Sequence, residues 1–196
     1  YRSDQPCGDG RKAPCAESLA ETQTMLGAEQ EAWLCKQLKA SPATWNILAQ
    51  QVMVGRVDRV AGPAEGYSMD QWPGYEANRQ RLIKYLHDEK IANPVILTGD
   101  IHVNFANNIE LLGQGEKRIP VATELVGTSI SSGGNGLREP KDHAATLAEN
   151  PFVKFFNSER GYVRCTVTPR EWKSDYQALE YVVKPGSPIH TRASFV

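Results

Sequence analysis

The stretch NPVILTGDIHVNFANNI, residues 93–109, decides the fold. Its apolar run at residues 95–97 predicts a short buried strand, and Gly99 allows the chain to turn sharply where that strand ends. An acid and an imidazole follow at once, Asp100 and His102. Two interpretations are open at this point. Either the segment is a polar turn capped by Asp100, or the two side chains form part of a metal site, because carboxylate and imidazole are both metal ligands.

The residues before this stretch alternate between helical and strand patterns. Residues 27–39 predict a helix, residues 45–55 a strand buried on both faces, and residues 75–91 a second helix. A helix–strand–helix–strand order predicts a parallel or mixed sheet covered by helices. Ligands bind beyond the carboxyl ends of such strands, so the ends of the two predicted strands are the places to look for a site.

The residues after His102 follow a different pattern. Residues 105–113 and 118–127 predict strands, and residues 162–168 and 172–183 predict a hairpin that turns at TPRE. Between these strands lies a polar, glycine-rich loop, TSISSGGNGLREPKDH. We therefore expect a mixed α/β (α+β) fold in which the second part is antiparallel.

The composition is that of an ordinary globular protein and excludes some partners. The chain has 196 residues, enough for one sizeable domain, with 40% hydrophobic and 23% charged residues and a net charge of -1. This balance gives no electrostatic signal for nucleic acid or an anionic membrane, and no apolar run reaches the ~20 residues of a membrane span. The opening YRSDQPCGDGRKAPC is typical of a loop inside a protein, so we expect residues 1–196 to be a piece of a longer protein.

Further polar residues are candidates for binding. Two amides, Gln50 and Gln51, lie toward the end of the first predicted strand. One interpretation is that each faces solvent or forms a hydrogen bond with a neighbouring loop. The other is that an amide oxygen binds a metal ion or a phosphate. Asp70, Tyr75 and Arg79 surround the start of the second helix, where Arg79 could hold a phosphate. The alternative is core packing for Tyr75 and a salt bridge for Arg79. The cluster TSISSGGNG is either an anion cradle or a plain loop.

Two of the four cysteines lie close together in the first loop. No histidine accompanies Cys7 and Cys15, which argues against a zinc site. A short disulfide is the better interpretation, and it implies an oxidising compartment.

Six segments follow one another along the chain: MLGAEQEAWL, WNILAQQVMV, MDQWPGYEANRQRLIKYL, VILTGDIHVNFANN, VATELVGTSISSGGNG and FFNSERGYVRCTVTPREW. In this order they resemble the C-terminal half of the PhoD-like alkaline phosphatases. The resemblance implies a calcineurin-like metallophosphoesterase sandwich of mixed sheets flanked by helices, of which this chain is the C-terminal portion only. GDIH looks like the G-H-x-H metal-binding motif of that superfamily with Asp100 in place of the first histidine, and the strand before Gln51 is similar to one that ends in another metal ligand.

The resemblance also implies a function. Asp100 and His102 would be catalytic metal ligands, Gln51 a ligand or phosphate contact, and Asp70, Tyr75 and Arg79 substrate-binding residues. Calcium and iron ions would activate water to hydrolyse phosphomonoesters or phosphodiesters. Such enzymes are exported, so we expect a periplasmic or secreted protein.

The family's earlier metal ligands lie in an N-terminal half that this chain lacks. We therefore expect that half as a partner, covalently attached or nicked. Two alternatives remain, a phospholipase D-like phosphodiesterase on the same fold and a non-catalytic fragment that is active only with its missing half.

Overall fold

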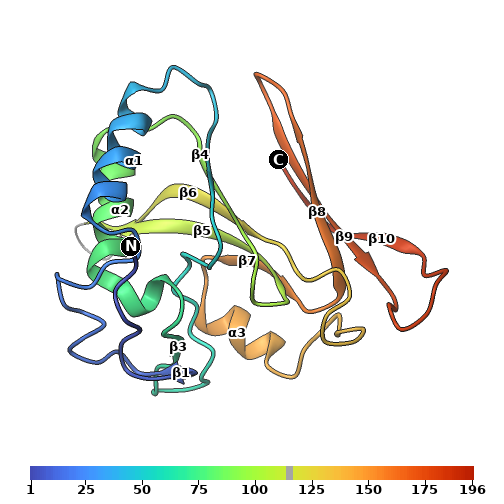
Figure 1. The fold of residues 1–196 in the computed structure, drawn as a ribbon. Coiled ribbons are helices and arrows are strands. Elements are labelled where there is room, and N and C mark those ends of the chain that lie inside the picture. The colour runs from blue at the N-terminus through green and yellow to red at the C-terminus, as the bar shows by residue number, and fades with distance from the viewer. Residues whose placement is uncertain (114–116) are drawn as a thin grey trace.

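The structure is a computed structural model that describes residues 1–113 and 117–196. Two helices stand beside a twisted sheet, and a second sheet lies on the opposite side of it (Figure 1). The helices are α1 (Ala28–Ala40), the 3-10 helix η1 (Trp72–Tyr75), α2 (Glu76–Asp88) and α3 (His143–Glu149). The strands are β1 (Arg11–Lys12), β2 (Asn46–Ala49), β3 (Tyr67–Ser68), β4 (Pro94–Thr98), β5 (Asn104–Leu112), β6 (Arg118–Val126), β7 (Val153–Asn157), β8 (Arg160–Val167), β9 (Trp172–Leu179) and β10 (Ile189–Phe195).

The main sheet is mixed, and it is covered on both faces. Its strand order is β2-β4-β6-β5-β7, with β2, β4 and β6 parallel and β5 antiparallel to both of its neighbours. One face packs through Leu48 and Ile96 against Leu82 and Leu86 of α2. The other face packs against the antiparallel sheet β10-β9-β8, where Tyr176 belongs to the shared core. The predicted mixed α/β sandwich is confirmed.

The predicted strand at residues 45–55 is wrong in its extent and position. β2 ends at Ala49, and it is an edge strand whose residues are alternately buried and exposed. Side chains form hydrogen bonds with the backbone directly after β2. Gln50 Nε2 donates to the Val52 carbonyl, and the buried Glu124 carboxylate accepts from the Val54 amide. Backbone groups that bond to side chains cannot pair in a ladder, so residues 52–55 are buried but are not a strand.

The other predicted elements are found within a few residues of their expected ends. The hairpin forms between β8 and β9, with Val167 paired to Trp172 across the predicted turn. The short helix α3 and the strands β7 and β10 were not predicted. β7 follows Pro151 and reads VKFFN, a short run that lacks strict alternation, and it joins the main sheet only as an edge strand.

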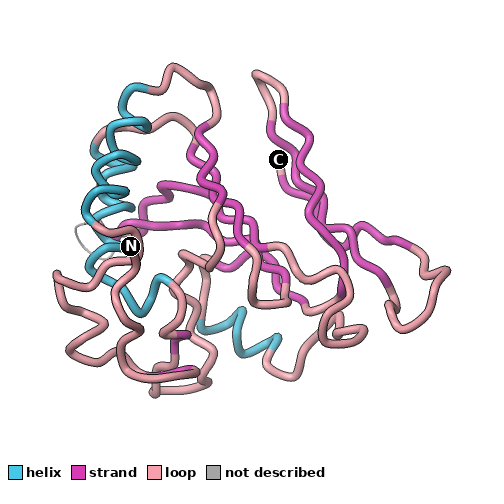
Figure 2. The backbone as a smooth tube through the Cα atoms, in the orientation of Figure 1, coloured by secondary structure: helices cyan, strands magenta, loops and turns pink. Residues whose placement is uncertain are grey.

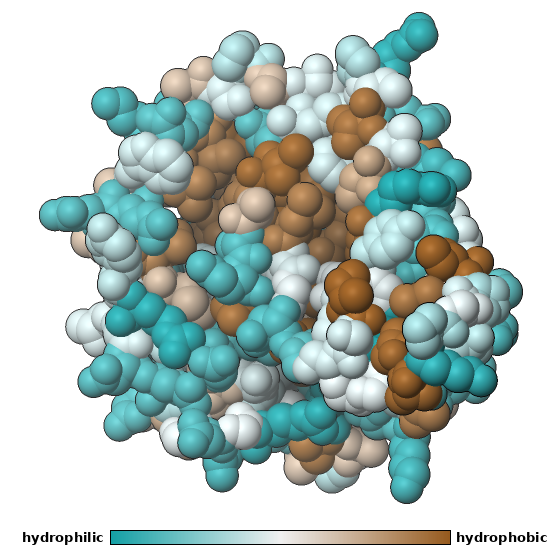
Figure 3. Space-filling view, turned by 45° about the vertical axis from the view of Figure 1, so that its right-hand side comes forward, coloured by the Kyte–Doolittle hydropathy of each residue, from teal (hydrophilic) through white to brown (hydrophobic). Residues whose placement is uncertain are grey.

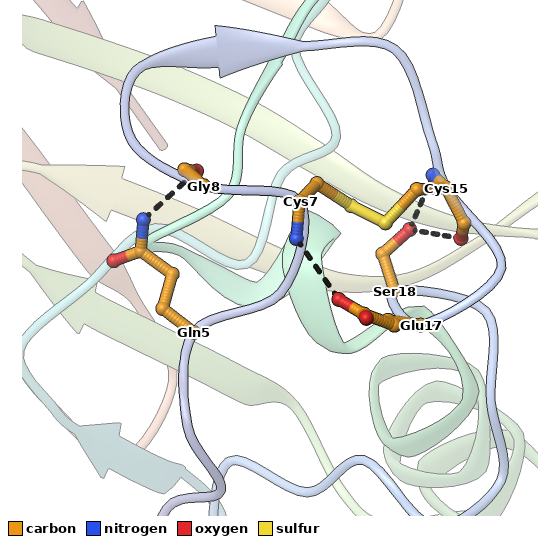
Figure 4. The surroundings of a disulfide bond; sticks show 6 residues. All are labelled: Gln5, Cys7, Gly8, Cys15, Glu17 and Ser18. Atoms are coloured by element: carbon orange, nitrogen blue, oxygen red, sulfur yellow. Dashed lines mark hydrogen bonds between the residues drawn. A yellow bond between two sulfur atoms is a disulfide. The ribbon is translucent and has the colours of Figure 1, made fainter.

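The first loop contains the expected disulfide between Cys7 and Cys15, whose Cα atoms are 5.9 Å apart (Figure 4). The Cys7 amide donates to Glu17, and the Ser18 hydroxyl donates to the Cys15 carbonyl at 2.9 Å. These contacts fold the loop back on itself beside the short β1–β3 ladder. Within the described ranges, no helix is both long enough and apolar enough to span a membrane.

Candidate active site

The segments that follow β2, β4 and β6 lie next to one another. The Gly99 amide donates to the Gln51 carbonyl at 3.1 Å, and the Gly127 amide donates to the Thr98 carbonyl at 2.9 Å. These bonds extend the parallel pairing by one step beyond the strands and bring Gln51 beside the turn that carries Asp100. Long loops gather at the end of the main sheet toward which β2 and β4 run (Figure 2). The carboxyl ends of the parallel strands therefore form one edge, as expected for a ligand site.

The turn after β4 has an unusual backbone. Asp100 and His102 both have positive φ angles, 70° and 54°, which few residues other than glycine adopt. The Ile101 amide donates to the Gly99 carbonyl at 2.9 Å, so the turn is tight, and both side chains are exposed. Left-handed conformations at such residues cost on the order of 1 kcal/mol each and persist where the surroundings impose them, often at functional sites. The turn presents a carboxylate and an imidazole at the edge of the sheet.

The donor set fits part of a metal site. Asp100 offers carboxylate oxygens, His102 ring nitrogens, and the exposed Gln51 an amide oxygen, the ligand types of hard and borderline cations. Across the described residues, however, no group of three or more His, Cys, Asp or Glu side chains is placed to hold a metal ion. The described part of the chain thus places two such residues on one turn, with the backbone of Gln51 beside it, and a full coordination sphere needs further donors.

The two glutamines after β2 have different surroundings. Both ends of the Gln50 amide are hydrogen-bonded within the fold. Its nitrogen donates to the Val52 carbonyl, and its oxygen accepts from Trp72 Nε1 at 2.8 Å. The Gln51 side chain is exposed at the site edge. Of the two amides, only Gln51 is available for a metal or phosphate.

The three residues predicted to bind substrate lie around the start of α2. Tyr75 is fully buried and its hydroxyl donates to the Ser3 carbonyl at 3.1 Å. Asp70 accepts from Arg2 at 2.9 Å. Arg79 is only 6% exposed and donates to the Val54 carbonyl and to Glu76. These contacts favour supporting roles, core packing for Tyr75 and an internal salt bridge for Arg79, and their contact with substrate stays a prediction.

A buried carboxylate that the sequence did not single out supports the edge. Glu124 of β6 has no exposed surface, and its oxygens accept from the amides of Val54 and Gly55 and from Asn107 Nδ2. Burial raises the pKa of Glu124, and these three donors oppose the shift. An acid inside an apolar strand run, VATELV, was the available signal.

A buried arginine was missed as well. Arg160 opens β8 and is 5% exposed. Its guanidinium bonds to the carbonyls of His102, Gly133 and Gly134 at 2.7–3.1 Å. The glycine-rich loop therefore turns carbonyl groups toward a cation. Of the two interpretations left open for this loop, this favours the plain loop over the anion cradle, in which amides would point at the ligand.

The fold agrees with the comparisons to known proteins. The sequence model described as PhoD-like phosphatase matches residues 1–176, and the chain belongs to that family. Alkaline phosphatase D of Bacillus subtilis (strain 168) is 46% identical over 196 residues, which are 100% of this chain and 34% of the relative. A solved structure described as "Structure of PhoD" superposes with a TM-score of 0.94 at 46% identity, over 100% of this chain and 37% of that one. The chain spans about a third of the relatives it matches. Family membership supports a phosphoester hydrolase.

Proposed function

We propose that this chain contributes one edge of the active site of a metal-dependent phosphoester hydrolase. The observation that carries the proposal is the strained turn with Asp100 and His102, which lies beside Gln51 at the carboxyl ends of β2 and β4. The family membership gives this edge its chemistry, since alkaline phosphatase D is among the relatives. Phosphomonoesters and phosphodiesters are the substrates we expect.

Each residue of the edge has a defined task in this proposal. Asp100 would hold a metal ion through a carboxylate oxygen and His102 through a ring nitrogen, while Gln51 would supply an amide oxygen to a metal ion or to the substrate phosphate. The chemistry that such ions, with calcium and iron proposed, would supply is polarisation of the phosphate and a lower pKa of a water molecule. In a second possible role, His102 donates a proton to the leaving oxygen.

The proposed partner is the N-terminal half of the same protein, covalently attached or nicked. β2 is an edge strand that exposes Ile47 (51%), and α1 exposes Trp33 (59%) nearby. A cavity of about 590 Å³ lies between them, lined mostly by apolar residues and also by Gln51. Exposed apolar groups next to an open strand edge invite another segment to cover them. Figure 3 shows hydrophobic residues in a hollow of the surface it displays.

The Cys7–Cys15 disulfide supports a periplasmic or secreted location.

Substitution of Asp100 in the full-length protein tests the proposal. We expect Asp100→Asn to lower aryl-phosphate turnover by at least about 100-fold and to release bound metal, because a neutral amide is a much weaker ligand for a cation. The measurements are kcat/KM and metal content by mass spectrometry. Asp88→Asn is the matched control, since Asp88 is an exposed carboxylate that pairs with Lys84 on α2. Unchanged metal content and turnover in Asp100→Asn would contradict the assignment.

A second comparison separates the alternatives. Turnover on a phosphomonoester, a phosphodiester and a phospholipid distinguishes a phosphatase from a phospholipase D-like enzyme. Metal content and turnover of residues 1–196 alone, with and without the N-terminal half, test the non-catalytic alternative. We expect neither tight metal binding nor turnover without that half, so an active isolated chain would overturn this part of the proposal.

A further inference from the structure

A single buried guanidinium connects two segments of the proposed site. Arg160 Nη1 donates to the His102 carbonyl at 2.7 Å, and Nε and Nη2 donate to the carbonyls of Gly134 and Gly133 at 2.8 and 3.1 Å. Nη1 also lies 2.7 Å from the Ser158 carbonyl. Arg160 therefore holds the turn after β4 and the glycine-rich loop after β6 at the same time.

Arg160 forms no ion pair with any residue that the structure describes. Within residues 1–113 and 117–196, no carboxylate lies within 4.0 Å of its nitrogens, whereas Arg192, also on the second sheet, pairs with Glu159 at 2.6 Å. Burial lowers the pKa of Arg160. A buried cation without a counter-charge is costly unless all of its donors are satisfied. Main-chain carbonyls satisfy these donors, so the cost is offset only when both segments are in place.

The loop is shaped to fit against this guanidinium. Gly133 has a φ of 83°, and a Cβ atom there would lie 2.9 Å from Arg160 Nη2. At Gly136 a Cβ atom would lie 1.7 Å from the Ser158 carbonyl oxygen. Glycine is thus required where the loop approaches residues 158–160.

A second bridge ties the same two segments together. The Asn104 side chain, two residues after His102, accepts from the Thr128 amide at 3.1 Å and donates to Asn157 at 2.6 Å. Asn104 is 2% exposed, and its bond to Asn157 is buried. A second hydrogen bond therefore links the chain just after the turn to the start of the loop.

We propose that Arg160 is a positioning residue, which fixes His102 in its left-handed conformation and couples it to the glycine-rich loop. Arg160 acts through the His102 main chain and does not touch substrate. The inference rests on the proposed function for its effect on catalysis, but the coupling itself does not. Lysine cannot replace arginine here, because three donors on one nitrogen do not match acceptors spread over two segments.

Arg160→Lys in the full-length protein tests this role. We expect kcat to fall about 10- to 100-fold, with metal affinity reduced by a similar factor, as is typical when the support of a metal ligand is removed. Hydrogen exchange at residues 99–104 and 128–137 should accelerate at least 10-fold, while the thermal midpoint stays within a few degrees. Arg164→Lys is the matched control on the same strand, since the Arg164 side chain is largely exposed and pairs with Asp175, away from the His102 turn.

The outcomes separate this inference from the proposed function. Kinetics, metal affinity and exchange within twofold of the wild type would overturn the positioning role. Accelerated exchange over the whole protein, with a matching loss of thermal stability, would also overturn it, because it would show a general structural role. A wild-type protein that neither binds metal nor hydrolyses phosphoesters would defeat the proposed function alone, and local exchange in Arg160→Lys would still decide the coupling.

Discussion

The segments after β2 and β6 flank the Asp100–His102 turn, and each is held by a buried side chain of the opposite kind. Residues 50–57 are held by the buried carboxyl group of Glu124, which accepts from main-chain amides. Residues 128–136 are held by the buried guanidinium of Arg160, which donates to main-chain carbonyls. The first segment therefore turns amide groups toward an acceptor, and the second turns carbonyl groups toward a donor.

The two segments also differ in what they can bury. Residues 52–54 place three apolar side chains in the core, so burial of apolar surface adds to the hydrogen bonds. The glycine-rich loop has few apolar side chains, and its Ile130 is 62% exposed. Hydrogen bonds are therefore the main support of the second segment, and loss of a single buried donor should loosen it locally. Loss of Glu124 should instead destabilise the core.

The largest expected effect on stability is from Glu124→Gln in the full-length protein. The variant keeps the shape but replaces one acceptor oxygen with an NH₂ group that faces amide donors. At least one buried amide is left without an acceptor, which we expect to cost about 3 kcal/mol of unfolding free energy. Denaturant titration measures this difference. A cost below about 1 kcal/mol would show that Glu124 does not support residues 50–57.

The pH dependence of that difference follows from the raised pKa of Glu124. A carboxyl whose pKa is higher in the folded state contributes stability below its unfolded pKa of about 4.3, and this contribution is lost as pH rises through the folded pKa. Gln does not titrate. The stability advantage of the wild type over Glu124→Gln should therefore be largest near pH 4 and decline toward neutral pH. An advantage that grows with pH would contradict the direction of the shift.

A pair of glycine variants tests the second segment with a smaller expected effect. Gly134 and Gly136 have nearly equal φ angles, 73° and 72°, but only Gly136 has a backbone atom in the way of a Cβ. We expect Gly134→Ala to cost about 1 kcal/mol from backbone strain, and Gly136→Ala about 2 kcal/mol because the loop must also move away from Ser158. Thermal unfolding and local hydrogen exchange measure both. Equal effects would show that the loop is not pressed against the backbone of residues 158–159, between β7 and β8.

The sequence predicted the candidate ligand residues of the site better than the buried side chains that hold their segments in place. The run before Gly99 and the polar pair after it predicted both β4 and the position of Asp100 and His102, because strand, glycine and ligand-type residues are local signals. The end of β2 could not be predicted, since it depends on Glu124, which is 70 residues away from Val54 in the chain. In the sequence, Arg160 resembles any charged residue at the start of a strand. Its role depends on contacts with Gly134 and His102, which are 26 and 58 residues away in the chain.

Gln50→Ala should have an effect as small as that of Gly134→Ala, and it separates the role of Gln50 from that of Glu124 within residues 50–57. The Gln50 oxygen accepts from Trp72 Nε1 at 2.8 Å, and Trp72 is 2% exposed. Loss of that acceptor leaves a largely buried donor unpaired, which costs about 1 kcal/mol. Glu124 still holds the Val54 and Gly55 amides in this variant, so hydrogen exchange at those two positions should stay as in the wild type. Faster exchange there would mean that Gln50, and not the buried carboxylate, sets the path of the chain after β2.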